Sequence, residues 1–115
     1  MKTFEEFQAL ATKVPLSLRN NRDRINLPIL RLQEEAGKIG SLLAKAAAFE
    51  KLSLTQAQKS EVRDRLADVL WCVALFCGET GIAMPDLATH SLAQLQLRAK
   101  SGSAIKGAGL RAPQF

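Results

Sequence analysis

The stretch "VRDRLADVLWCVALFC", residues 62–77, decides the fold that this sequence predicts. Apolar residues recur in it every three or four positions, as they do along one face of an α-helix: Val62, Leu66, Val69, Leu70, Val73 and Phe76. From Val69 to Cys77 the helix is apolar on every side. Because such a helix has no solvated face, the stretch predicts a central helix around which other helices pack.

The sequence before this stretch predicts further helices and shows no strand-like alternation. Thr3 is the expected cap of a short first helix, in a capping box with Glu6, and Pro15 is expected to end it. Asn26 is the expected cap of a long second helix that has Pro28 in its first turn.

Capping residues and a proline also mark the ends of the central helix and the start of the helix that follows it. Ser53 or Thr55 is expected to cap the central helix, and Gly81 is expected to end it. Pro85 and Asp86 begin a fourth helix with an apolar stripe. The sequence therefore predicts an all-α bundle of four to five helices.

The positive charge is concentrated near the C-terminus. The helices predict one domain over residues 1–100, followed by a tail at 101–115 that is rich in Gly, Ala and Ser. The net charge is +5, but eleven acids against twelve basic residues leave only +1 over residues 1–86. The other positive charges are Arg98, Lys100, Lys106 and Arg111. Phosphate groups are natural partners for such a segment, and a tail that only increases solubility is the alternative.

Cysteine usage and hydropathy indicate a cytoplasmic protein. The spacing of Cys72 and Cys77 fits neither a CxxC motif nor a zinc site. We therefore expect both to be small buried side chains of a protein in a reducing compartment. The longest apolar run, residues 69–77, is too short to span a bilayer, and the acidic N-terminal stretch does not resemble a signal peptide. We therefore expect no membrane partner.

Charged side chains share one face of each long helix. Arg31, Glu35 and Lys38 lie three and four residues apart, with Glu34 also close to Lys38. Asp68 lies in the apolar run "LADVLW", where a carboxylate is costly unless it is paired or binds a cation. Ordinary salt bridges between neighbouring turns are the simplest account of these charges.

Three stretches together resemble the MazG-like, all-α nucleoside triphosphate pyrophosphohydrolases. They are "LRLQEEAGKIGSLLAK" (30–45), "DRLADVLWCVALFCGETGI" (64–82) and "LATHSLAQLQLRAKSGSAIKGAGLR" (87–111), and the resemblance spans residues 26–111. It implies an enzyme that splits a nucleoside triphosphate into the monophosphate and pyrophosphate. It also implies Mg²⁺ held by an EExxE motif on one helix and an ExxD motif on the next, and a homodimer or homotetramer.

Only part of this metal-binding motif is present. Glu34 and Glu35 match the first two acids of EExxE, but Lys38 stands at the third. Asp68 matches the acid of ExxD, but Arg65 stands in place of its Glu. A cation 4 Å from a like unit charge costs about 4 kcal/mol at an effective dielectric of 20. The two basic residues therefore predict weak or absent Mg²⁺ binding.

Other family positions are altered as well. Ser91 and Gln94 stand where the family often has an Asn and a Lys near the nucleotide. The one histidine, His90, is expected at the surface or in a helix cap rather than in catalysis. If phosphate groups bind, the candidate basic residues are Lys38, Arg65, Arg98, Lys106 and Arg111.

Four interpretations follow, and whether the chain is an enzyme stays open among them. In the first, it is a degenerate family member with weak or no catalysis, in which Glu35 and Asp68 are retained and Lys38 and Arg65 replace the metal as counter-charges. In the second, a shifted site still holds one Mg²⁺, and its ligands are Glu34, Glu35, Asp64 and Asp68. In the third, the chain binds nucleotides or other phosphates without metal. In the fourth, it is a helical assembly module.

Overall fold

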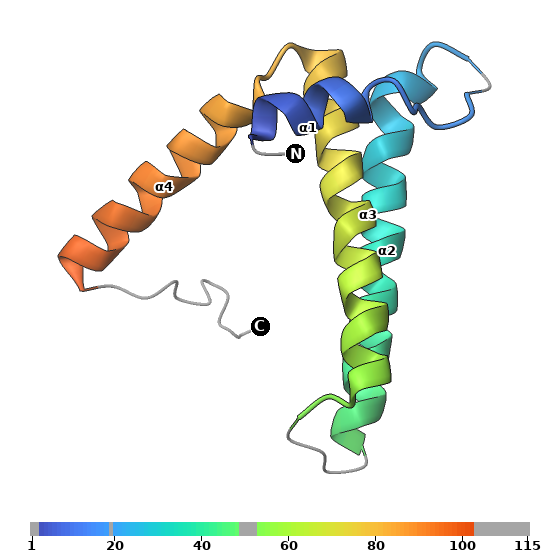
Figure 1. The fold of residues 1–115 in the computed structure, drawn as a ribbon, viewed down its shortest axis with the longest axis vertical. Coiled ribbons are helices and arrows are strands. Elements are labelled where there is room, and N and C mark those ends of the chain that lie inside the picture. The colour runs from blue at the N-terminus through green and yellow to red at the C-terminus, as the bar shows by residue number, and fades with distance from the viewer. Residues whose placement is uncertain (1–2, 19, 49–52, 103–115) are drawn as a thin grey trace. The chain divides into compact units, whose positions relative to one another are not determined.

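The computed structural model describes residues 3–18, 20–48 and 53–102, which form four helices and no strand and so confirm the all-α prediction (Figure 1). The helices are α1 (Phe4–Ala11), α2 (Asp23–Ala48), α3 (Gln56–Thr80) and α4 (Met84–Ser101). The chain divides into two compact units, Met1–Ala83 and Met84–Phe115. That residues 1–100 fold as one domain stays a prediction.

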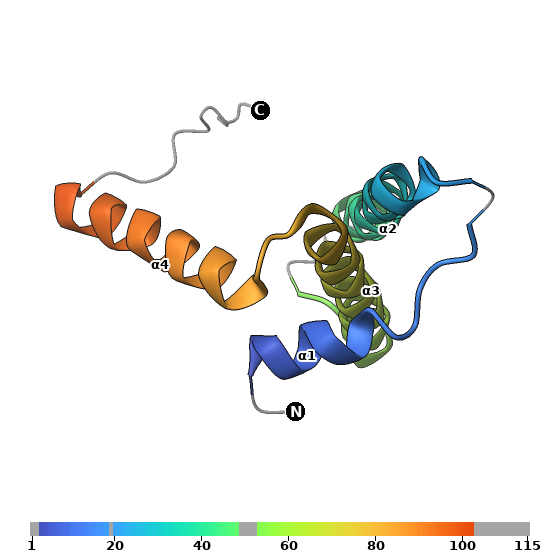
Figure 2. The same cartoon turned by 90° about the horizontal axis from the view of Figure 1, so that it is seen from above.

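An antiparallel pair of long helices forms the body of the first unit. α2 and α3 lie side by side over most of their length, and α1 packs against the C-terminal half of α3 (Figures 1 and 2). The side chain of Gln8 donates a hydrogen bond of 2.9 Å to the carbonyl oxygen of Ile82, just beyond α3. Trp71 donates from Nε1 to the carbonyl oxygen of Val14 at 3.1 Å. These two bonds fix α1 and its following loop onto α3.

Capping residues define where α1 begins and where α3 begins and ends. The hydroxyl of Thr3 accepts a hydrogen bond of 3.0 Å from the backbone of Glu6, as predicted. Thr55 forms a reciprocal capping box with Gln58 at the start of α3. Gly81 ends α3 with a φ of 76°, a left-handed conformation that glycine adopts without steric cost. Thr3, Thr55 and Gly81 are thus confirmed as helix caps.

The predicted boundaries of two other helix ends were wrong. α1 ends at Ala11, four residues before Pro15. α2 begins at Asp23 rather than after Asn26, because the Asn20 side chain accepts hydrogen bonds from the backbone of Arg22 and Asp23 at 3.0 and 3.3 Å. Asn20 thus satisfies backbone donors that every helix start leaves unpaired.

Pro28 consequently lies inside α2 instead of in its first turn. Proline has no backbone N–H, so α2 lacks one of its backbone hydrogen bonds at this position. Pro28 is buried, so its ring contributes apolar contact at the point where the backbone bond is lost.

Few apolar side chains are fully buried among the described residues. The buried ones are Ala11, Pro28, Ala46, Cys72, Ala74, Leu75, Cys77 and Met84. Burial raises the pKa of both cysteine thiols, which are free, so their packing agrees with the predicted role as small apolar groups. Several leucines on α2 and α3 stay half exposed, which indicates that the pair does not cover its own apolar surface.

No single helix among the described residues is long and apolar enough to cross a membrane; only α3 and α4 taken together reach that length and composition.

Candidate functional site

The only fully buried carboxylate among the described residues is Glu35, which α2 directs toward α3. Its Oε2 accepts a hydrogen bond from Arg31 Nε at 3.1 Å, one turn earlier on α2. Its Oε1 accepts a hydrogen bond from Arg65 Nη1, also at 3.1 Å, across the helix pair. Lys38 Nζ lies 3.6 Å from Oε2. One carboxylate is therefore shared by three cations from two helices.

These contacts decide the protonation of Glu35. Burial alone would raise its pKa, because the charged form loses hydration. Hydrogen bonds from Arg31 and Arg65 and the charge of Lys38 oppose burial and leave the pKa below its ordinary value. The hydrogen bond to Glu35 in turn raises the pKa of Arg31. Glu35 is therefore ionised at neutral pH despite its burial.

Arg31 connects Glu35 to the other acids. Its Nε lies 4.0 Å from Glu34 Oε1, and its Nη2 lies 3.9 Å from Asp68 Oδ2 on α3. Its guanidinium also lies over the ring of Trp71, 6.0 Å from the ring centroid. We refer to the following residues as the ion-pair cluster: Arg31, Glu34, Glu35, Lys38, Arg65 and Asp68.

The motifs did not place Arg31 among the candidate site residues. It lies three residues before Glu34 and four before Glu35, and this spacing was the available indication that it pairs with both acids. Its contact with Asp68 could not be found in this way, because it joins two helices whose register the spacing does not give.

The sequence singled out Asp68 as the acid in apolar surroundings, but the structure buries Glu35 instead. The side chain of Asp68 is 40% exposed and pairs with Arg31, whereas the side chain of Glu35 is fully buried. Asp68 lies toward one side of the α2–α3 contact and keeps access to water, although its sequence neighbours are apolar. Glu34 is more exposed still and pairs with Lys38 at 3.7 Å, as the four-residue spacing predicted.

The arrangement does not suit a hard divalent cation. An ion bound at Glu35 would lie within a few ångströms of Arg31, Lys38 and Arg65, and each unit charge at 4 Å costs about 4 kcal/mol at an effective dielectric of 20. Asp64, the ligand of the shifted-site interpretation, is exposed and pairs with Arg63 at 3.6 Å. Among the described residues, no three His, Cys, Asp or Glu side chains converge as a metal site would require.

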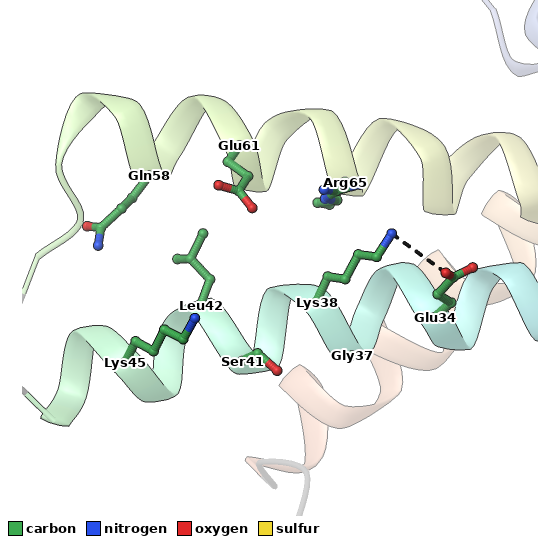
Figure 3. A pocket seen from close by; sticks show the side chains of 9 residues that line it. All are labelled: Glu34, Gly37, Lys38, Ser41, Leu42, Lys45, Gln58, Glu61 and Arg65. Carbon is green, nitrogen blue, oxygen red and sulfur yellow. Dashed lines mark ion pairs between the residues drawn. The ribbon is translucent and has the colours of Figure 1, made fainter.

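An open pocket of about 630 Å³ adjoins the ion-pair cluster (Figure 3). Lys38 extends into it from α2, and Glu61 and Arg65 approach from α3. Arg65 Nε is buried and has no hydrogen-bond partner among the described residues. The complete lining is Glu34, Gly37, Lys38, Ser41, Leu42, Lys45, Gln58, Glu61 and Arg65. Sequence motifs did not single out Ser41, Lys45 or Gln58, because only the pairing of α2 with α3 brings them together.

The remaining candidates belong to the second unit or lie outside the described residues. On α4, His90 Nε2 lies 3.1 Å from Gln94 Nε2, and both side chains are exposed, which agrees with the expected surface position of His90. Ser91 is exposed on the same helix, and Arg98 is exposed in its last turn. Two of the predicted phosphate-binding residues, Lys106 and Arg111, fall outside the described residues.

Comparison with protein-family models, with curated proteins and with solved structures gives no match to this chain. The likeness to MazG-like proteins consequently rests on the sequence motifs alone.

Proposed function

We propose that this chain is a degenerate MazG-like protein that does not catalyse metal-dependent hydrolysis of nucleoside triphosphates. The observation that supports this proposal is the environment of Glu35, which is fully buried and paired with Arg31, Lys38 and Arg65. In the family's motif this position is an acid that holds Mg²⁺. Here basic side chains supply the counter-charge that a metal would supply, and they belong to the fold itself.

The charge balance of the ion-pair cluster supports the same proposal. Its three acids are balanced by three bases, so the cluster is neutral without an added ion. A catalytic cage for phosphoanhydride hydrolysis needs surplus negative charge to concentrate divalent cations, because these cations orient the phosphates and activate the attacking water. The cluster offers no such surplus, because its acids are already paired with basic side chains of the chain itself.

The test is pyrophosphate release from a panel of ribonucleoside and deoxyribonucleoside triphosphates with Mg²⁺ or Mn²⁺. We expect the natural chain to show no turnover above that of its Asp68→Ala variant. The Asp68 side chain is 40% exposed, so this variant should stay folded. Turnover by the natural chain that Asp68→Ala abolishes would contradict the proposal.

Phosphate binding without metal is the second candidate function, and the pocket beside the ion-pair cluster favours it. Lys38, Lys45 and Arg65 line this pocket together with Ser41, and their positive charges suit a phosphate group. Glu34 and Glu61 line it too, so binding would have to overcome two acids.

The corresponding experiment is thermal denaturation with pyrophosphate or a nucleoside triphosphate in the presence of EDTA. A stabilisation that is lost in Lys45→Gln and kept in Lys59→Gln would support binding in this pocket, because Lys59 does not line it. Equal melting temperatures with and without phosphate compounds would exclude this second candidate.

A further inference from the structure

The end of the pocket that lies away from the ion-pair cluster holds one charge of each sign. Lys45 lines it from the last turn of α2, and Glu61 lines it from α3 (Figure 3). Within the part of the chain that the structure describes, neither side chain has an ion pair or a hydrogen bond. The other charged residues of the lining are paired within the ion-pair cluster: Glu34, Lys38 and Arg65. This end of the pocket therefore presents a cation and an anion that the described residues do not neutralise.

The amide group of Gln58 is oriented by the capping box at the start of α3. Its Oε1 accepts a hydrogen bond of 2.8 Å from the backbone N–H of Thr55, so Nε2 is the side-chain atom left to donate. Gln58 lines the same end of the pocket as Lys45 (Figure 3). An ammonium group and an amide N–H are both donors, and together they suit a carboxylate or a phosphate.

The start of α3 adds to this preference for an anion. Gln58 is the third residue of the helix, and the first turn contains no acid. Backbone N–H groups at a helix start leave a partial positive charge, which favours an anionic group nearby. An anion held by Lys45 and Gln58 would lie close to this charge.

Glu61 imposes a second requirement on the ligand. It follows Gln58 by three residues on α3, so the two side chains share one helix face. The carboxylate of Glu61 would repel a ligand that carries only negative charge, and it would attract an ammonium group on the same ligand. Leu42 is the one large apolar side chain of the lining, and it offers contact to a short carbon chain that joins the two groups.

We propose that this end of the pocket binds a small zwitterion with one ammonium group and one anionic group. Lys45 and Gln58 hold the anionic group, which is a carboxylate or a phosphate, and Glu61 holds the ammonium group. Amino acids and phosphorylated amino alcohols belong to this class. The inference rests on the pocket of the second candidate function, and it is independent of whether the chain hydrolyses nucleoside triphosphates.

The test is titration calorimetry of the full chain in EDTA with probes that differ in these groups. O-Phosphoethanolamine carries both groups, inorganic phosphate carries only the anion, and ethanolamine carries only the ammonium. β-Alanine and propionate make the same comparison for a carboxylate. We expect one of the two zwitterions to bind about tenfold more tightly than its anion-only counterpart, because the bond between Glu61 and an ammonium is charge-assisted. The zwitterion that does so identifies the anionic group.

Two variants of exposed acids on α3 assign this advantage to one side chain. Glu61→Gln should abolish the tighter binding of the zwitterion without weakening the binding of the anion-only probe. Asp64→Asn is the matched control, because its side chain is 72% exposed and does not line the pocket, and it should keep the advantage. Lys45→Gln should weaken the zwitterion and the anion-only probe alike.

The outcomes that would overturn the inference are distinct from those that concern phosphate binding. Equal affinities for the zwitterion and the anion-only probe would overturn it and leave metal-free phosphate binding intact. Absence of binding by every probe would overturn both. An advantage that survives Glu61→Gln would also overturn the inference, because another acid would then hold the ammonium group.

Discussion

The ion-pair cluster lies on the same two helices as a second region, which we call the apolar edge: the exposed side chains of Ile25 and Leu43 on α2 and of Leu66 and Leu70 on α3. Glu35 is fully buried, and its charge is balanced inside the chain by Arg31, Lys38 and Arg65. Leu66 and its neighbours on the apolar edge are about half exposed. The buried charge therefore has its counter-charges within the chain, whereas the exposed apolar side chains keep contact with water.

Because of this difference, substitutions in the two regions should affect different properties of the protein. Substitutions in the ion-pair cluster should alter unfolding and the response to ions or pH. Substitutions on the apolar edge should change the free energy of unfolding less, because these side chains are already exposed to water. Three predictions test this separation, in order of decreasing effect.

The largest effect is expected from Lys38→Glu combined with Arg65→Glu. Glu35 would lose two of its three cations and gain two acids, so the free energy of unfolding should fall by about 3 kcal/mol or more without metal. Mn²⁺ at a hundred times its dissociation constant should then restore about 2.7 kcal/mol, measured as a higher melting temperature.

Lys38→Gln combined with Arg65→Gln is the matched control, since it removes the same cations without adding acids. We expect Mn²⁺ to stabilise the glutamate pair and not the glutamine pair. A folded glutamate variant that binds no Mn²⁺ would show that these positions do not correspond to the family's metal ligands.

A smaller effect is expected from replacing Glu35 alone. Glu35→Gln keeps the size of the side chain but leaves three cations without their shared counter-charge. We expect a loss of about 2 kcal/mol in the free energy of unfolding, below the roughly 3–5 kcal/mol for a fully buried pair, because Arg31, Lys38 and Arg65 are 35%, 43% and 32% exposed.

Glu34→Gln is the control for this variant, because Glu34 is 58% exposed and shares contacts with Arg31 and Lys38. It should change the free energy of unfolding by less than about 0.5 kcal/mol in urea titrations. Equal losses for the two glutamine variants would show that burial of Glu35 does not determine the strength of the cluster.

The smallest effect is expected from mild acidification. The pKa of Glu35 is lower in the folded chain than its ordinary value of 4.5, so the unfolded chain takes up this proton first. The stabilisation from Glu35 is therefore complete above about pH 4.5 and is lost as the pH falls through the folded-state pKa. Thermal denaturation of the natural chain and of Glu35→Gln between pH 7 and pH 3 should show a shallower decline for the variant.

An equally steep decline in both proteins would assign the acid sensitivity to other carboxylates.

Much of the local structure could be predicted from the residues. Thr3, Thr55 and Gly81 mark helix ends as expected, because each acts on backbone groups within one turn. The start of α2 could not be predicted as well, because Asn20 and Asn26 are both good caps and the sequence gives no reason to choose the earlier one. The pairing of Glu34 with Lys38 followed from spacing alone.

The sequence by itself determined that the chain is helical and which charges share a helix face. Only the tertiary structure decided that Glu35, rather than Asp68, is the buried acid, and that Arg65 reaches it from the other helix. Helical periodicity fixes neighbours within one helix, whereas burial depends on how two helices are rotated and aligned against each other. That alignment also places the ion-pair cluster and the apolar edge on opposite sides of one helix pair.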